Sequence, residues 1–245
     1  MVFACSCARL GRPEPRTRYT ETMFTGIIQA VGTIDETIAQ SLVRDPSPDH
    51  AWTDAQGLRL LVSWGGLDFT DVKEGDSIAI NGACMTVLRP DEQGFAVDIS
   101  RESLDRTVGL DGPGPVNLEK ALRWSDRLGG HLVSGHIDAV ATAVAIEPRD
   151  ESVRLTVRVP TSLGPFVTEK GSVALHGVSL TINQLRDHAE GTDIEINLIP
   201  HTWQSTTLSR LEVGGGVNLE VDPMARQMAR IIERMGSLQR AKQDV

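Results

Sequence analysis

The chain has 245 residues and a formal net charge of -9 at pH 7, within the range of soluble globular proteins with one large or two smaller domains. The acidic balance and the 4% aromatic content argue against nucleic-acid binding, because phosphate contacts need clustered Lys and Arg and base stacking needs aromatic rings. No stretch approaches the roughly 18 apolar residues of a membrane span. Cys5, Cys7 and Cys84 are an odd, sparse set, which favours a reducing cytoplasm over a disulfide-stapled secreted protein.

Residues 1–22 differ in composition from the rest of the chain, with several arginines, two prolines and no hydrophobic periodicity. We expect a disordered extension, and Met23 is a candidate for the true start. Cys5 and Cys7 would form only half of a metal site, because no cluster of His or Cys lies nearby to complete it. We therefore expect no bound metal.

Short β-strands separated by Gly and Asp turns are predicted along the body of the chain. In the first half they are expected over 26–33, 59–64, 77–80, 85–88 and 95–99. In the second half they are expected over 137–146, 153–159, 172–175, 179–185 and 193–198. Short helices are predicted over 70–73 and 163–167, and residues 44–56 are expected to form an exposed loop insertion. So many closely spaced strands favour closed barrels over a parallel sheet.

The C-terminal segment is predicted to be a helix over 224–238, with Asp222 as its N-cap and Pro223 in its first turn. Its apolar side chains recur at helical spacing and form one stripe, which comprises Met224, Met228, Ile231, Ile232 and Met235. The stripe is expected either to pack on the barrels of its own chain or to form a contact between subunits.

The second half of the chain repeats the first. The matched blocks are 24–31 with 133–140, 80–87 with 175–182, and 116–119 with 217–220. Matches separated by roughly 100 residues indicate a duplicated domain, since solenoid repeats have shorter periods. We expect domains over 23–120 and 121–221, followed by an oligomerisation helix in 222–245. A duplicated binding site suggests two similar ligands held side by side.

Several motifs resemble those of the riboflavin synthases, the homotrimeric type with two tandem barrels per chain. They are Met23-Phe24-Thr25-Gly26-Ile27-Ile28, residues 129–137 (Gly-Gly-His-Leu-Val-Ser-Gly-His-Ile), Ser179-Leu180-Thr181, and residues 197–202 (Asn-Leu-Ile-Pro-His-Thr). The resemblance implies an all-β fold of two tandem, similar, closed six-stranded β-barrels with short helices and a C-terminal α-helix.

The same resemblance implies an activity, a partner set and a location. Two molecules of 6,7-dimethyl-8-ribityllumazine would react by four-carbon transfer, giving riboflavin and 5-amino-6-ribitylaminouracil, without a metal or organic cofactor. It further implies a cytoplasmic homotrimer whose site lies between the N-terminal barrel of one subunit and the C-terminal barrel of its neighbour. Lumazine synthase is a candidate partner.

The candidate catalytic residues are Cys84, Ser77 and His136. Cys84 and Ser179 occupy equivalent positions in the repeat, although a free Cys is also commonly a small buried hydrophobic residue. His136 is aligned with the inert Ile27 in the repeat, and its imidazole could move protons near neutral pH. Ser77 matches a polar position of the family, and a turn hydroxyl that caps a backbone amide would explain it equally well.

The resemblance places the substrate contacts on strand ends and loops, which would offer directional hydrogen bonds to a pyrimidine edge and a ribityl chain. They are Gly26, Ile27, Ile28, Cys84, Met85, Thr86, Asp98, Ile99, Ser100, Arg101, Glu102, Ser103, Gly135, His136, Ile137, Lys170, Ser179, Leu180, Thr181, Asn197, Leu198, Ile199, Pro200, His201 and Thr202. Thr86 and Thr181 are also explained by β-propensity, and Lys170 by a solvated surface position. His131 is expected to be a loop or packing residue.

His176 stands where many members of the family have an acidic residue, so either it replaces that group in proton transfer or another group does. A non-catalytic lumazine- or flavin-binding carrier of the same fold is the main alternative function. Carriers are expected to lose residues from one site, whereas this chain keeps Cys84, His136 and Ser179. A flavin-dependent oxidoreductase is disfavoured, because residues 214–216 lead into a strand instead of a nucleotide-binding helix.

Overall fold

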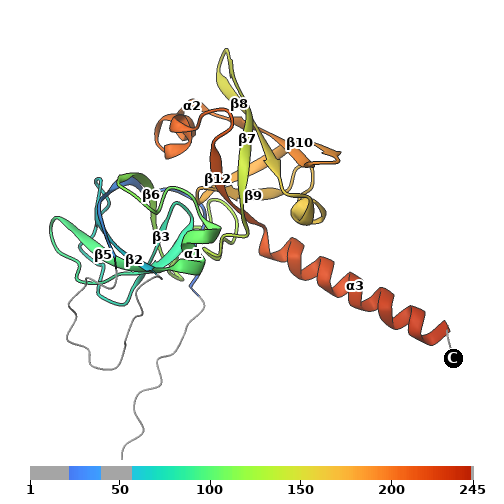
Figure 1. Ribbon diagram of the computed structural model, residues 1–245, viewed down its shortest axis with the longest axis horizontal. Coiled ribbons are helices and arrows are strands. Elements are labelled where there is room, and N and C mark those ends of the chain that lie inside the picture. The colour runs from blue at the N-terminus through green and yellow to red at the C-terminus, as the bar shows by residue number, and fades with distance from the viewer. Residues whose placement is uncertain (1–21, 40–56, 244–245) are drawn as a thin grey trace, which may run out of the picture.

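The computed structural model describes residues 22–39 and 57–243, with only the backbone described over 236–243. The predictions for the N-terminal extension, for Cys5 and Cys7, and for the loop insertion over 44–56 lie outside the described residues. Two β-barrels lie next to each other, and a long C-terminal helix extends away from them (Figure 1).

The first barrel is a six-stranded antiparallel sheet with the order β4-β3-β6-β1-β2-β5. Its strands are β1 (Ala30–Ala39), β2 (Gly57–Ser63), β3 (Ser77–Ile80), β4 (Ala83–Thr86), β5 (Gly94–Ser100) and β6 (Gly114–Lys120). One bridge connects its edges, in which the amides of Leu88 and Ala96 each donate to the other's carbonyl over 2.8 Å. A short helix, α1 (Arg101–Arg106), follows β5.

The second barrel is fully closed, with the order β10-β11-β8-β7-β12-β9. Its strands are β7 (Ala139–Arg149), β8 (Ser152–Val159), β9 (Ser172–Leu175), β10 (Val178–His188), β11 (Gly191–Leu198) and β12 (Gly216–Val221). Its short helices are η2 (Thr161–Phe166), α2 (Pro200–Gln204) and η3 (Thr207–Arg210). The long strand β10 pairs with both β9 and β11, whereas its counterpart β4 is too short to pair fully with β5.

The predicted all-β fold of two barrels is confirmed, with the difference that the first barrel closes through a single bridge. The strands over 77–80 and 172–175 match β3 and β9, whereas other predicted boundaries are shifted. Residues 26–29 and 137–138 precede β1 and β7 instead of belonging to them, and β4 begins and ends two residues earlier than predicted. The helix predicted over 70–73 is wrong, since the structure forms turns there, and the second predicted helix is the 3₁₀ helix η2.

Each barrel has its own apolar core, formed by the inward-facing side chains of alternating strand positions. Ile34, Leu60 and Leu118 are fully buried in the first barrel, and Leu155 and Ile194 in the second. Burying a side chain of this size contributes about 1.5–3 kcal/mol. The alternation leaves the opposite face of each strand, including Ser179 and Thr181 on β10, available for other contacts.

The two barrels meet at a seam formed by their equivalent hairpin turns, Asn81-Gly82 and His176-Gly177. Asn81 and His176 both have positive φ, 44° and 46°, and each is followed by a positive-φ glycine. The turns touch so closely that a Cβ on Gly82 would lie 2.6 Å from the backbone nitrogen of Gly177. Glycine is therefore required at these positions by space as well as by conformation.

Two buried asparagines connect the barrels across this seam. Asn117 of β6 donates to the carbonyl of His176 over 2.9 Å and accepts from the amide of Thr207 over 2.8 Å. Asn218 of β12 donates to the carbonyl of Asn81 over 3.1 Å and accepts from the amide of Val108 over 2.7 Å. The two sets of bonds are equivalent in the repeat, so the seam has pseudo-twofold symmetry.

We expect His176→Asn to remove an acid-sensitive step in the stability of the protein. Burial lowers the pKa of His176 to about 4, from 6.5. The unfolded chain therefore binds a proton near pH 6.5 that the folded chain binds only near pH 4, so the free energy of unfolding falls as the pH drops between these values. The loss approaches about 3 kcal/mol.

The substitution mirrors the other barrel, because Asn81 accepts from the amide of Asn117 much as the Nδ1 of His176 accepts from the amide of Asn218. Urea unfolding of both proteins between pH 4 and 7.5 measures the difference. An equal decline of stability in the variant would contradict the assignment of this step to His176.

The C-terminal helix α3 (Pro223–Gln243) extends away from both barrels (Figure 1). The amide of Met224 donates to the Asp222 carboxylate over 2.9 Å, in agreement with the predicted N-terminal cap. All five members of the apolar stripe are more than half exposed, so packing on the barrels of the same chain is excluded for this conformation. No helix among the described residues is both long and apolar enough to span a membrane.

Candidate functional site

The segments that precede each barrel contact the opposite barrel. Phe24, before β1, pairs with Val133, before β7, through amide-to-carbonyl bonds of 2.7 and 3.0 Å. The carbonyl of Gly26 accepts from the amide of Ser179 in the second barrel over 2.8 Å. The carbonyl of Gly135 accepts from the amide of Cys84 in the first barrel, also over 2.8 Å. We call residues 24–28 and 133–137 the crossing segments.

The side chains at the ends of the crossing segments also contact the opposite barrel. Ile28 packs against the core of the second barrel, and Ile137 packs against the core of the first. Each candidate site therefore combines strand residues of one barrel with a segment whose sequence belongs to the repeat unit of the other.

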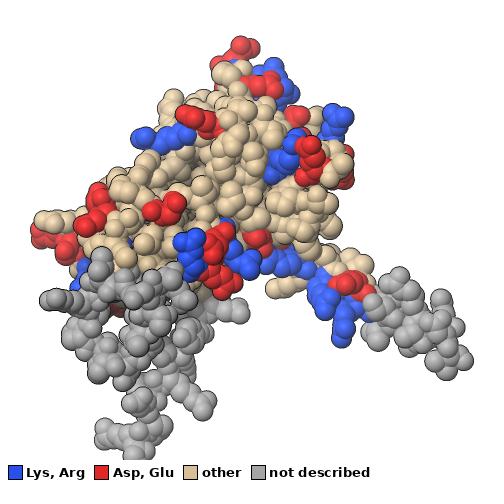
Figure 2. All heavy atoms as spheres, in the orientation of Figure 1, with Lys and Arg blue, Asp and Glu red and all other residues tan. Residues whose placement is uncertain are grey.

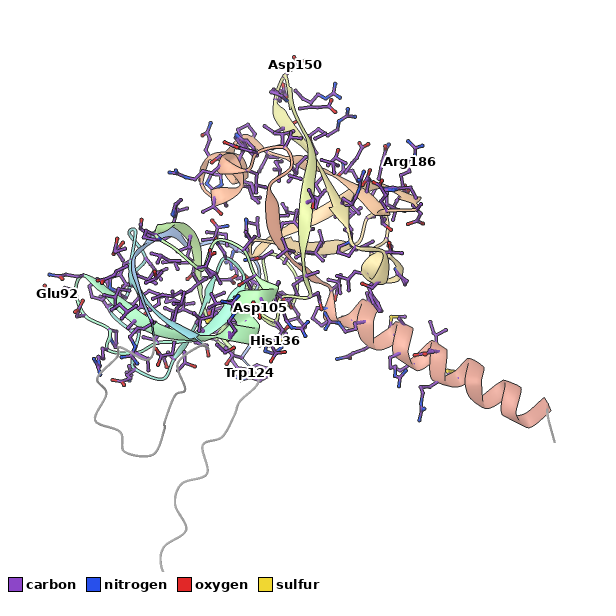
Figure 3. The ribbon with its side chains drawn as sticks, in the orientation of Figure 1. Glu92, Asp105, Trp124, His136, Asp150 and Arg186 are labelled. Atoms are coloured by element: carbon purple, nitrogen blue, oxygen red, sulfur yellow. The ribbon has the colours of Figure 1, made fainter. Side chains whose placement is uncertain are left out.

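The first candidate site gathers Cys84, Ser77 and His136. Cys84 on β4 pairs with Ala79 on β3, two residues from Ser77, and the Ser77 hydroxyl is hydrogen-bonded to the Cys84 side chain. The Ser77 hydroxyl also lies 3.2 Å from that of Thr22. His136 follows Gly135 in the crossing segment, and its side chain is exposed near the junction of the two barrels (Figure 3).

The thiol of Cys84 is neutral at physiological pH. Burial raises its pKa, and the negative charge of Glu220 acts in the same direction, although the hydrogen bond with Ser77 opposes both. A neutral thiol is a weak hydrogen-bonding group and not the nucleophilic thiolate that covalent chemistry requires. Cys84 is therefore suited to contact a ligand or to pass a proton.

The second candidate site contains Ser179 and Thr181 on β10 with Gly26 and Ile27 of the crossing segment. The Nδ1 of His131 lies 2.7 Å from the hydroxyl of Ser179. Burial lowers the pKa of His131, so the imidazole is neutral, and its Nε2 has no partner among the described residues. The expectation that His131 is a loop or packing residue did not include this hydrogen bond with Ser179.

The remaining predicted contacts fall into two groups. Met85, Ile99, Leu180 and Leu198 are buried in the barrel cores, so they can reach a ligand only through their backbone. The residues that remain at the surface or at strand ends are Thr86, Asp98, Ser100, Arg101, Glu102, Ser103, Lys170, Asn197, Ile199, Pro200, His201 and Thr202.

Several of these surface residues already have structural roles. The Asp98 carboxylate binds the Arg59 guanidinium through two bonds of 2.7 and 2.8 Å. Ser100 caps α1 by accepting from the amide of Ser103, and Ile199 occupies the equivalent N-cap of α2. Residues 98–103 and 197–202, expected as strand-end loops, thus include the starts of two short helices. Lys170 is exposed with a φ of 62°, where its counterpart is Gly75.

His176 is buried in the seam between the barrels, where its Nδ1 accepts from the amide of Asn218, and it is not part of either crossing segment. Two residues that the sequence analysis did not select, Glu119 and Glu220, bind the crossing segments directly. The matched Val-Asn-Leu-Glu blocks at 116–119 and 217–220 were the available signal for them.

The charged side chains on the visible face do not favour nucleic-acid binding. Acidic and basic side chains alternate over both barrels, and broad areas carry neither charge (Figure 2). Such a mixture lacks the continuous basic stripe that nucleic-acid binding requires.

Comparisons with known proteins agree with the duplicated site. The family model of the lumazine binding domain matches the chain twice, over residues 25–121 and 134–222. The riboflavin synthase of Mycobacterium tuberculosis (strain H37Rv) is 40% identical over 219 residues, which cover 87% of this chain and 100% of that protein. The riboflavin synthase of Photobacterium phosphoreum is 39% identical over 216 residues, covering 86% of this chain and 89% of its own.

Among solved structures, LumP complexed with riboflavin superposes with a TM-score of 0.67 at 24% identity, over 81% of this chain and 98% of that one. This likeness supports the fold. The fold and its paired strand-end sites thus define a protein with two lumazine-binding domains in tandem. The chain belongs to the riboflavin synthase family.

We expect Ser179→Ala to destabilise the protein more than Cys84→Ala, although the two positions are equivalent in the repeat. Removing the Ser179 hydroxyl leaves a buried imidazole without its hydrogen bond, which costs about 1–3 kcal/mol. The Cys84 thiol is hydrogen-bonded to the hydroxyl of Ser77, which is partly exposed. Water can therefore replace the thiol as the partner of that hydroxyl in Cys84→Ala. Urea unfolding at pH 7.5 compares the two variants, and equal losses would count against a structural hydrogen bond between His131 and Ser179.

Proposed function

We propose that this chain is a transferase that converts two molecules of 6,7-dimethyl-8-ribityllumazine into riboflavin and 5-amino-6-ribitylaminouracil. One substrate molecule gives a four-carbon unit to the other. The two products together contain all the atoms of the two substrates, so the reaction needs no external oxidant or reductant. The observation that carries this proposal is the pair of equivalent sites, both of which keep a polar strand residue and a crossing segment.

A duplicated site suits a reaction between two copies of one molecule. Holding both copies in register replaces a bimolecular collision, and this advantage can reach roughly 7–11 kcal/mol when the geometry is ideal. The strand-end amides and hydroxyls near Ser179 and Cys84 would bind the pyrimidine edge and the ribityl chain of each copy. The cores behind them exclude water from one side of each ligand.

The chemistry within the pair has to be unequal, because one substrate donates carbon and the other accepts it. The two sites differ at equivalent positions of the repeat. Cys84 in the first site corresponds to Ser179 in the second, and His136 corresponds to Ile27. We assign proton transfer in the first site to His136, whose exposed imidazole follows Gly135, the backbone partner of Cys84. Ser77 and Cys84 would position the ligand and relay protons to it.

We also propose that the working form is a cytoplasmic homotrimer in which a neighbouring subunit faces each candidate site, with lumazine synthase as a further partner. The support for association is α3, whose apolar stripe stays exposed in the single chain. Cys84 is a free cysteine, which suits a reducing compartment.

Incubation of the purified protein with 6,7-dimethyl-8-ribityllumazine alone tests the proposed reaction. We expect riboflavin to form in half the molar amount of the substrate consumed, without added metal or cofactor. Tight binding of the substrate without turnover would instead identify a carrier of the same fold.

We expect His136→Gln to lower kcat by about 10²–10⁴-fold, the usual contribution of a positioned acid–base group. Glutamine retains hydrogen-bonding capacity and removes the titrating proton, so substrate affinity should change little. The pH–rate profile should lose the limb that belongs to the imidazole. A variant with near-normal kcat over pH 5–9 would show that His136 is not the proton-transfer group.

We expect Ile231→Glu combined with Ile232→Glu to yield a folded monomer. The substitutions place charges in the apolar stripe, and each would be expensive to bury in a contact between subunits. Sedimentation velocity measures the oligomeric state, and Arg230→Glu with Glu233→Arg, which exchanges two exposed charges on the same helix, is the control. An unchanged trimer in the first variant would exclude the stripe as the contact.

A further inference from the structure

Two buried glutamates bind the crossing segments through equivalent sets of hydrogen bonds. The Glu119 carboxylate, at the end of β6, accepts from the amide and hydroxyl of Thr25 over 2.7 Å each and from the amide of Gly26 over 2.9 Å. The Glu220 carboxylate, at the end of β12, accepts from the amide and hydroxyl of Ser134 over 2.6 and 2.7 Å. It also accepts from the amide of Gly135 over 2.9 Å.

Both carboxylates are almost completely enclosed, with 3% of Glu119 and 1% of Glu220 exposed. Burial raises the pKa of each, and the donated hydrogen bonds oppose that shift. A buried carboxylate is expensive unless its oxygens are satisfied, and here the donors come from the crossing segments. Each segment is therefore tied to its carboxylate, because neither side can leave without exposing an unsatisfied polar group to a dry interior.

The segments bound in this way also touch the key strand residue of the opposite barrel. Gly26 donates its amide to Glu119 of the first barrel, and its carbonyl accepts a hydrogen bond from the amide of Ser179 in the second barrel. Gly135, held by Glu220 of the second barrel, accepts the Cys84 amide of the first. A Cβ on either glycine would lie 2.6 Å from the Cβ of Ser179 or of Cys84, so small displacements of a segment move it against these side chains.

We infer that Glu119 and Glu220 are positioning residues with a crossed action: Glu119 of the first barrel sets the site around Ser179 in the second barrel, and Glu220 of the second barrel sets the site around Cys84 in the first. The ligand assigned to these sites rests on the proposed function. The crossing itself rests on the hydrogen bonds alone. Neither glutamate is assigned a contact with substrate.

Hydrogen exchange measures the crossed action without requiring catalysis. In Glu119→Gln, one acceptor oxygen becomes an amide group that cannot accept from an N–H, so we expect amides 25, 26 and 179 to exchange about tenfold faster or more. Amides 84, 134 and 135 should stay protected. Glu220→Gln should show the reverse pattern. Faster exchange at Cys84 in Glu119→Gln, or equal changes at both sites, would overturn the inference.

Double-mutant cycles on turnover give the second test, with the two glutamates as matched controls for each other. Glu119→Gln should be non-additive with Ser179→Ala and additive with Cys84→Ser, because only the first pair shares a site. Glu220→Gln should be non-additive with Cys84→Ser and additive with Ser179→Ala. A uniform loss in all four combinations would identify the glutamates as general stabilising residues and overturn the inference.

Milder variants cover the case in which a glutamine variant fails to fold. Thr25→Val and Ser134→Ala each remove the hydroxyl bond to the glutamate and leave its two amide bonds in place, and they should show the same crossed pattern at smaller size. Thr25→Val also removes the acceptor of the Ile27 amide, so faster exchange is expected at that amide too. If the wild-type protein binds substrate without turnover, the cycles are measured on riboflavin affinity by fluorescence titration. Loss of the proposed function and loss of the crossed action are therefore separate outcomes.

Discussion

The structure depends on the reciprocal hydrogen bonds of Asn117 and Asn218. Each side-chain amide is buried in one barrel and is hydrogen-bonded to the other barrel, at its hairpin turn and at the segment that follows its first short α-helix. A buried amide without partners costs roughly 1–3 kcal/mol per lost bond, so neither barrel satisfies its own asparagine when it is alone. The two barrels therefore have one fixed arrangement, and only in that arrangement can the crossing segments reach the opposite strands.

The bonds that join each crossing segment to the opposite strand use the backbone, which frees the side chains at those positions to differ. Amide-to-carbonyl contacts hold Gly26 to Ser179 and Gly135 to Cys84 in the same way, whatever the side chain at the second position. The repeat could thus diverge at the positions that face a ligand while the two frames stayed equivalent. A reaction between two identical molecules needs this combination of equal binding frames and unequal chemistry.

The sequence predicted the barrels well, because alternating apolar residues and Gly turns are local signals. It could not predict that residues 26–28 leave the first barrel, since their composition suits a strand and their partners lie far along the chain. Glu119 was visible as part of a repeated block, but its role depends on Thr25, 94 residues away. Alternation along the strands turns the side chains of Met85 and Leu180 into the cores, whereas the resemblance to the family had placed both among the ligand contacts.

The helix α3 is the one described long element without a counterpart in the repeat, and this explains its exposure. The pseudo-twofold seam uses the equivalent turns of both barrels, so it offers no free surface for a further contact of the same kind. Each apolar side chain of the stripe would gain about 1.5–3 kcal/mol from complete burial, and a single chain leaves that gain unused. Because a twofold pairing is completed inside the chain, we assign the proposed contact between chains to α3, the element that lies outside the repeat.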